Sequence, residues 1–148
     1  MSGWTTNLLS GIAQLLADAG VGVWRPDGSP YAAGDTGIVD SGMPPEPERV
    51  ICLGAYPVSD HPSQADVTVG VQVRTRAGRD PREVRDLDDA VFEVLHGLEQ
   101  TELGGVRVVQ IYRRSSAALG QARDATDRWE WTSNYYVDAM RPTAARPF

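Results

Sequence analysis

The period of the hydrophobic pattern changes in the middle of the chain, between residues 66 and 98. Along the first half of this stretch, β-branched residues occupy every second position: Val67, Val69, Val71, Val73 and Thr75. A period of two predicts a strand with one buried face. Along the second half, apolar residues recur at helical spacing: Val84, Leu87, Val91, Val94, Leu95 and Leu98. This spacing predicts a helix whose apolar side covers the sheet.

Capping residues mark where this helix begins. Asp80 can accept hydrogen bonds from the free amides of the first turn, and Pro81 suits the first helical position. Glu83 follows Asp80 at the spacing that lets its side chain reach back to the amide of the cap. We therefore expect a capping box at the start of this helix.

The other segments extend this into an α+β pattern. An apolar stripe at helical spacing predicts a first helix over residues 5–19, ended by Gly20. Strands are predicted for four further segments: residues 21–24, 49–55, 106–113 and 128–140. The remaining segments predict an irregular excursion, a mobile loop and a C-terminal tail: residues 25–48, 114–126 and 142–148. We expect one domain over residues 1–148, with a single antiparallel or mixed β-sheet of about four to five strands covered by two α-helices.

Composition narrows the classes of function. The net charge is −6, and all 14 basic residues are arginine. An acidic protein gains nothing from counterion release at phosphates, so tight binding of DNA over a wide surface is not expected. No apolar run approaches the roughly 20 residues that span a bilayer, so no membrane partner is expected either. Cys52 is the single cysteine, which excludes an intrachain disulfide and predicts a buried thiol.

One group of residues could be offered as metal ligands. Asp60, His61 and Asp66 lie close together, but the same connection holds the prolines and serines of an ordinary turn. Their spacing matches no zinc pattern, and the sequence has no glycine-rich phosphate loop or nucleophile elbow. We therefore expect no catalytic residue, no metal and no cofactor. A small metal-dependent hydrolase is kept as an alternative.

Acidic residues also gather on the predicted central helix. Asp86, Asp88 and Asp89 could suggest a carboxylate pair for acid–base chemistry. The helical pattern assigns them instead to the solvated face. His96 stands at the end of this helix, where a histidine meets the helix dipole and the last carbonyls favourably.

Arginines flank the predicted mobile loop, and aromatic residues follow it. Basic groups interleaved with aromatics can mark single-strand nucleic-acid binding. Aromatic strand positions more often pack a core or an interface. A loop that becomes ordered against a protein partner explains the arginines equally well. The residues alone leave these alternatives open.

Taken together, the chain resembles a family of small virion proteins of long-tailed phages, the minor capsid or tail terminator proteins. The resemblance lies in four stretches in the expected order: VGVWRPDGSPY at 21–31, GIVDSGMPPEPERVICLGAYPVSD at 37–60, VGVQVRTRAGRDPREVRDLDDAVFEVLHGL at 69–98, and RWEWTSNYYVDAMRP at 128–142. The segment 114–125 matches least.

The resemblance implies a structural virion protein without catalytic residues. Such a protein caps the head-proximal end of the tail tube, stops tube polymerisation and presents a surface to the head connector, usually as a hexameric ring. Its expected partners are the tail tube protein, head–tail connector proteins and other copies of itself, and it would be assembled in the host cytoplasm. Six chains at −6 each give −36, so an acidic channel wall would let phage DNA pass without specific binding. A neck or head–tail completion protein is the alternative within this class.

Two sets of residues are expected to contact partners. A mobile basic loop suits docking onto a preformed surface, so we expect this loop and its arginines to face the tail tube: Arg113, Arg114 and Arg123. Residues in or beside the excursion are expected to contact the neck or a neighbouring subunit: Trp24, Tyr31 and Met43. An excursion that packs on its own sheet is equally compatible with the sequence.

Overall fold

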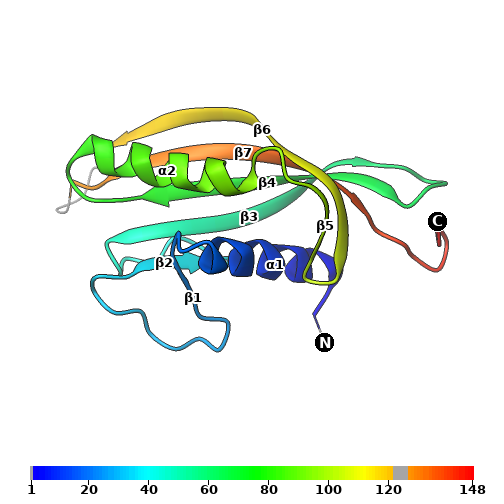
Figure 1. The fold of residues 1–148 in the computed structure, drawn as a ribbon, viewed down its shortest axis with the longest axis horizontal. Coiled ribbons are helices and arrows are strands. Elements are labelled where there is room, and N and C mark those ends of the chain that lie inside the picture. Colours follow the sequence, from blue (N-terminus) through cyan, green and yellow to red (C-terminus); the bar gives the residue numbers. More distant parts are fainter. Residues whose placement is uncertain (1, 122–126) are drawn as a thin grey trace.

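The structure is a computed structural model that describes residues 2–121 and 127–148 (Figure 1). The described residues form two helices and seven strands. In chain order these are α1 (Trp4–Asp18), β1 (Val23–Trp24), β2 (Thr36–Val39), β3 (Arg49–Asp60), β4 (Asp66–Arg76), α2 (Pro81–Leu95), β5 (Glu99–Leu103), β6 (Val106–Gln121) and β7 (Trp129–Met140).

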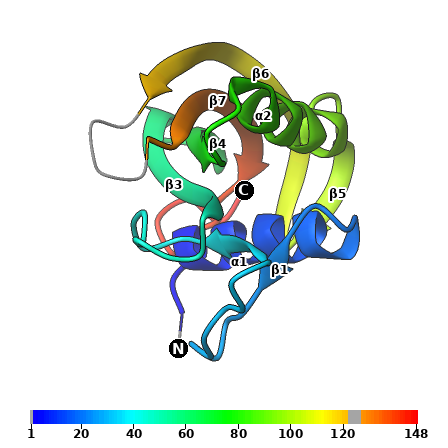
Figure 2. The same cartoon turned by 90° about the vertical axis from the view of Figure 1, so that its left-hand side faces the viewer.

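All seven strands belong to one mixed sheet that curls into a half-barrel (Figure 2). The strand order is β1-β2-β3-β4-β7-β6-β5. The first three strands are parallel, and every other neighbouring pair is antiparallel. The expected sheet of four to five strands is therefore wrong. The hydrophobic pattern missed β2 and β5, which are short strands near the two ends of the sheet. They are too short to show a long apolar alternation, and backbone pairing with their neighbours holds them in the sheet.

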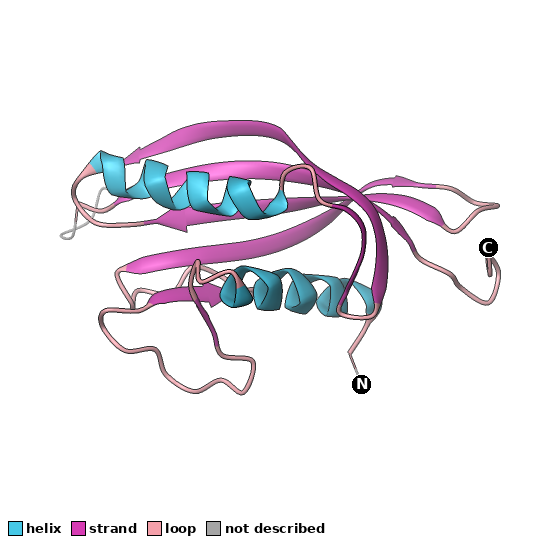
Figure 3. Ribbon diagram, viewed as in Figure 1, coloured by secondary structure: helices cyan, strands magenta, loops and turns pink. Residues whose placement is uncertain are grey.

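Both helices lie on the concave side of the half-barrel, and the core fills the space between them and the strands (Figures 2 and 3). The predicted alternation in β4 is confirmed, because Val67, Val69, Val71, Val73 and Thr75 are all buried. In β7 the buried positions from Ser133 to Ala139 also alternate. On the helices, Leu8, Ile12 and Leu16 of α1 and Val84, Leu87 and Val91 of α2 complete the core.

Strand β6 is longer than the sequence pattern indicates. Residues 114–121, expected to belong to a mobile loop over 114–126, continue β6 and pair with β7 as far as Gln121 and Trp129. Residues 122–126 lie outside the described residues. The small polar side chains of this segment give no strand signal, yet its backbone pairs with an aromatic strand that does. β3 likewise continues beyond the expected end at residue 55, as far as Asp60.

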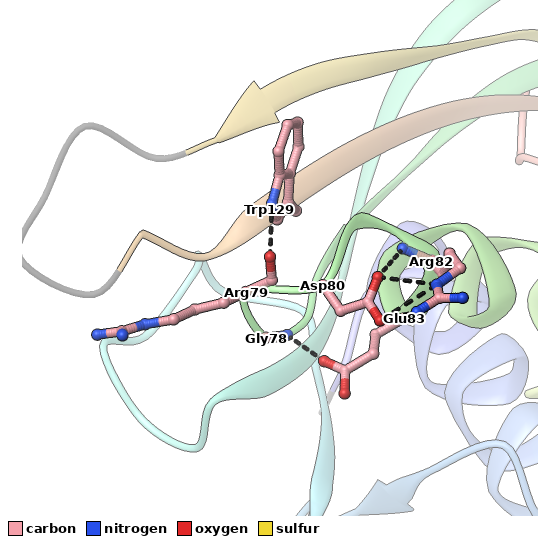
Figure 4. Close-up of polar contacts among 6 residues, drawn as sticks. All are labelled: Gly78, Arg79, Asp80, Arg82, Glu83 and Trp129. Atoms are coloured by element: carbon pink, nitrogen blue, oxygen red, sulfur yellow. Dashed lines mark hydrogen bonds and ion pairs between the residues drawn. The ribbon is translucent and has the colours of Figure 1, made fainter.

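The start of α2 is capped, but by a different arrangement from the expected capping box (Figure 4). The Asp80 carboxylate accepts a hydrogen bond from the amide of Arg82 at 3.0 Å, as predicted for the cap. The Glu83 carboxylate accepts from the amide of Gly78 at 3.0 Å, not from that of Asp80. The indole of Trp129 donates to the carbonyl of Arg79 at 2.9 Å. These bonds fix the turn between β4 and α2 against β7.

Helix α1 contacts strands from both sides of the curled sheet, because it packs against β5 and β6 as well as β1, β2 and β3. A Cβ atom added at Gly11 would overlap backbone atoms of Leu103 and Gly104. Gly104 itself has a φ of +59°, and a Cβ there would overlap the carbonyl of Asn7. The helix therefore crosses the β5–β6 turn at backbone contact distance, which only glycine permits.

We predict that Gly11→Ala destabilises the protein, although alanine usually favours a helix by about 1 kcal/mol over glycine. The added methyl group pushes α1 away from the β5–β6 turn, and such overpacking typically costs about 1–3 kcal/mol. Urea unfolding followed by circular dichroism measures the change. Gly54→Ala is the matched control, because a Cβ there meets no atom within 4 Å. A Gly11→Ala variant as stable as this control would contradict the prediction.

Candidate assembly surfaces

The outer edge of β6 is covered along only part of its length. β5 pairs with β6 over residues 106–110, and Ile111 exchanges backbone hydrogen bonds with Gly97 and Leu98 at 2.8 and 2.9 Å. The amide of Arg113 then donates to His96 Nδ1 at 3.0 Å. Beyond that point, over residues 114–121, no described segment pairs with the outer edge of the strand. Residues 114–119 are all exposed.

A second open edge lies on the opposite side of the sheet, along β3. β2 pairs with β3 only over residues 49–52, so residues 53–60 have no described neighbour on their outer edge. Tyr56 and Val58 are exposed here, at 38% and 40%. A cleft of about 270 Å³ lies beside this segment and is lined by Thr5, Ala55, Tyr56, Pro57, Asp60, Val69 and Arg141.

Arg113 faces the interior of the protein. Its Nη1 lies 3.5 Å from Asp88 Oδ2, and its guanidinium stacks 4.3 Å from the ring centroid of Phe92. Asp88 is only 2% exposed, and its Oδ1 accepts a hydrogen bond from the Ser133 hydroxyl at 2.7 Å. Burial raises the pKa of the Asp88 carboxyl, while the Ser133 bond and the Arg113 charge act to lower it.

This arrangement corrects the expectation that the three aspartates lie on the solvated face of the helix. Asp86 and Asp89 are exposed, but Asp88 points into the core. Its position next to Leu87 brings it over β6 and β7, where Arg113 and Ser133 supply the polar partners that a buried carboxylate needs. The hydroxyl of Tyr135 is also buried there, without a hydrogen-bond partner among the described residues.

Of the three arginines expected to face the tail tube, the two that the structure describes do not share a surface. Arg113 is engaged with Asp88, whereas Arg114 is exposed on the outer edge of β6. A bulge between Arg113 and Ser115 leaves Arg114 without a partner in β7. Arg123 lies outside the described residues. The hydrophobic pattern ended this strand at residue 113, so it did not indicate that Arg114 continues the same strand on the other side from Arg113.

The excursion brings together two of its three predicted contact residues. Trp24 and Tyr31 line an open cleft of about 720 Å³, which Met43 does not line. The Tyr31 hydroxyl donates to the carbonyl of Ile38 in β2, so this tyrosine also fixes the excursion to the sheet. Asp40 and Glu46 lie in the same cleft. The cleft therefore combines aromatic side chains with two acidic residues and the basic Arg25.

The convex face of the half-barrel is polar, and its side chains bond across the strands. Asp138 accepts from Thr68 at 2.6 Å and from Gln110 at 2.7 Å. The Tyr56 hydroxyl donates to Asn134 Oδ1 at 3.0 Å, and its ring lies over Gly70, where a Cβ would overlap it. These polar side chains are therefore hydrogen-bond partners of one another across the strands. The sequence pattern marked these positions as polar but not as partners.

The metal-ligand candidates do not converge. The described residues contain no group of three or more histidine, cysteine, aspartate or glutamate side chains that could hold a metal ion. His61 Nδ1 instead accepts from the amide of Ser63 at 3.2 Å, as in an ordinary turn. Cys52 is half-buried, and burial raises the pKa of its thiol. No helix in the described ranges has the length and apolarity to cross a membrane.

Comparison with known proteins identifies a family and similar solved structures. The family model for the bacteriophage tail terminator protein matches residues 15–140. No curated protein sequence matches the chain significantly. A chain from the virion of a native gene transfer agent particle has a similar structure, with a TM-score of 0.66 and 16% sequence identity, covering 94% of this chain and 99% of that chain. At this identity the likeness shows a shared fold.

We predict that Asp88→Ala destabilises the protein by about 1–3 kcal/mol, because it leaves Ser133 and the partly buried Arg113 without their acceptor. Asp89→Ala, at the adjacent exposed position, should change the free energy of unfolding by less than about 0.5 kcal/mol. Chemical unfolding of both variants checks this. Equal effects of the two substitutions would contradict the internal role of Asp88.

The raised pKa of Asp88 also predicts a pH dependence. The Asp88 carboxyl binds its proton more tightly in the folded protein than in the unfolded chain. The protonated carboxyl therefore adds to the free energy of unfolding at low pH, and this contribution is lost as the pH rises from the ordinary pKa of 3.8 through the higher pKa of the folded protein. Over that range, wild type should lose stability relative to Asp88→Asn, which cannot titrate. Unfolding curves of both proteins at matched pH test this. A difference that is constant with pH would contradict it.

Proposed function

The chain belongs to the bacteriophage tail terminator family, and on that premise we propose that it caps the head-proximal end of the tail tube, stops tube polymerisation and forms the interface to the head connector. It is a structural protein of a virion tail. The match over residues 15–140 supports the proposal, because it includes every described strand of the sheet and the whole of α2. A protein of this kind acts by occupying a surface, so no reaction is assigned to it.

The proposal includes assembly into a ring, with six copies as the expected number. The observation that carries it is the pair of open strand edges, on β3 and on β6, that lie on opposite sides of the sheet. Contacts between two different patches generate rings when the rotation closes. A ring covers edges that would otherwise invite aggregation. With −6 on each chain, a ring also suits a channel wall that repels DNA.

Contacts with other virion proteins are proposed for two regions. Arg113 is less available for such a contact, because it already pairs with Asp88 within the chain. Arg114, which is exposed on β6, and Arg123 stay the arginines proposed to contact other chains. The cleft that holds Trp24 and Tyr31 is proposed to contact the neck, because aromatic side chains with acidic neighbours can anchor a basic partner segment.

We predict that deleting this gene alone, from a phage or from a tail-gene expression set, gives overlong tubes that lack heads. Without a cap, nothing stops addition of tube subunits, and no surface receives the connector. Negative-stain microscopy scores tail length and head attachment. Restoring the gene in trans should restore normal particles.

Other outcomes of the same experiment would exclude termination. Tails of normal length without heads would assign the chain to the neck as a completion protein. Normal joined particles would exclude both roles.

A further inference from the structure

We propose that the outer edge of β6 over residues 114–121 pairs with the outer edge of β3 over residues 53–60 in a neighbouring copy of this chain, as antiparallel strands. The inference rests on the proposed ring and specifies which edges join its subunits. It makes the sheet continuous from one subunit to the next.

The strand directions allow this pairing. β3 is antiparallel to β4, β4 to β7 and β7 to β6, so β3 and β6 run in opposite directions. A second copy that continues the sheet with the same face outward therefore brings its β3 antiparallel to β6 of the first. The two open segments are equal in length, so each can cover the other from end to end.

Most of the open edge of β6 lacks two of the devices that protect an edge in a protein that stays single, although bulges interrupt it at Arg114 and Leu119. Soluble proteins place charged residues or proline on exposed edges to prevent pairing with other chains. Residues 115–121, with the sequence SSAALGQ, contain neither. An uncharged edge of this length that is not covered within its own chain is a template for strand addition.

Charges at one end of the two segments are complementary. Antiparallel alignment of the segments places Arg114 opposite Asp60 of the neighbouring copy. Both residues are exposed, and no ion pair joins either of them to another described residue. Opposite charges that face each other across antiparallel strands stabilise the pair and help to set its register. This assigns Arg114 to the contact between subunits, not to the tail tube.

At the other end of the two segments, an exposed apolar side chain of β6 lies opposite the cleft beside β3. Leu119 is 50% exposed, and a bulge between Ala118 and Gly120 leaves it without a partner in β7. The same alignment places Leu119 opposite Ala55, which lines the cleft of about 270 Å³ beside β3. Of the large apolar side chains exposed in the described ranges, only Phe148 lies outside these two edges; the others are Leu119, Tyr56 and Val58.

The two edges also fix the kind of assembly. They are different surfaces of one chain, so each copy uses its β6 toward one neighbour and its β3 toward the other. Once such a ring closes, every copy has both of its open edges paired with a neighbour. Pairing of β6 with β6 would instead be two-fold and would stop at a dimer.

The test is a disulfide between the two edges in assembled particles. Arg114→Cys and Asp60→Cys are combined in a Cys52→Ser background and oxidised, and the chain is detected on a non-reducing gel. Facing residues on antiparallel strands have Cα atoms about 4.5–5.5 Å apart, which suits a disulfide. We expect a ladder of linked chains up to the size of the ring. Gln72→Cys with Asp60→Cys is the matched control, because Gln72 lies on the exposed face of the inner strand β4.

Two results would overturn the proposal. Linked dimers formed by Arg114→Cys alone would show that β6 pairs with itself. Joined particles of the double variant that never yield linked chains would show that these edges do not meet. If deletion of the gene gives overlong tubes while the double variant does not cross-link, termination stands and the edge pairing fails.

A second measurement does not depend on cysteine geometry. Leu119→Asp should lower the yield of joined particles at least about tenfold. The charged carboxylate does not fit the apolar part of the cleft, and a loss of 1.4 kcal/mol at each contact between subunits weakens that contact about tenfold. Leu119→Met, which keeps an apolar side chain of similar size, should assemble normally. Leu119 is half exposed, so the fold of the monomer should withstand both changes, which circular dichroism verifies. Normal particles from Leu119→Asp would refute the contact.

Discussion

The packing of α1 across the concave side of the half-barrel is the constraint on which the rest of the structure depends. A curled sheet that does not close leaves its apolar face open to water, and burial of that face is the main driving force of folding. α1 covers it by contacting strands near both ends of the strand order. The backbone contact at Gly11 and Gly104 sets how closely this helix can approach. α2 packs on the middle of the sheet, where it contacts β4 and β7.

Because the barrel is incomplete, some of its strand edges are not paired within the chain. A closed barrel has no unpaired strand, whereas this sheet ends at β1 and β5, which are both too short to cover their neighbours fully. β2 and β5 each cover only the first part of the longer strand beside them, which leaves the far parts of β3 and β6 open at opposite sides. Unpaired backbone groups in such segments find partners in other chains. The same geometry therefore exposes the edges that the proposed contact between subunits would join.

The polar cluster around Asp88 connects α2 to the sheet. It links α2 to β6 through Arg113 and to β7 through Ser133, within an otherwise apolar layer. Buried polar groups contribute to a unique arrangement when each has a partner. The cluster lies where β6 passes from the part covered by β5 to the part that is open. It thereby holds the start of the open segment in one position against the helix.

Several elements followed from the sequence, and others did not. The alternation at Val67 to Thr75 and the helical stripe from Val84 reflect local periodicity, which a strand or helix imposes on its own residues, and both were predicted correctly. The continuation of β6 through residues 114–121 depends on pairing with a distant strand, so small polar side chains concealed it. Asp88 was misplaced because helical spacing says which residues share a face, but not how far the neighbouring strands extend over it.

What the sequence determined by itself was the family, two helices and the inward faces of the long strands, because these depend on patterns carried by neighbouring residues. The curl of the sheet, the division of Arg113 from Arg114, and the two open edges were decided only by the tertiary structure. Each of these depends on contacts between segments far apart in the chain, such as α1 with the β5–β6 turn or Asp88 with Ser133. Hydrophobic periodicity records which side of an element is buried, while the lengths of adjacent strands decide which backbone edges remain without a partner.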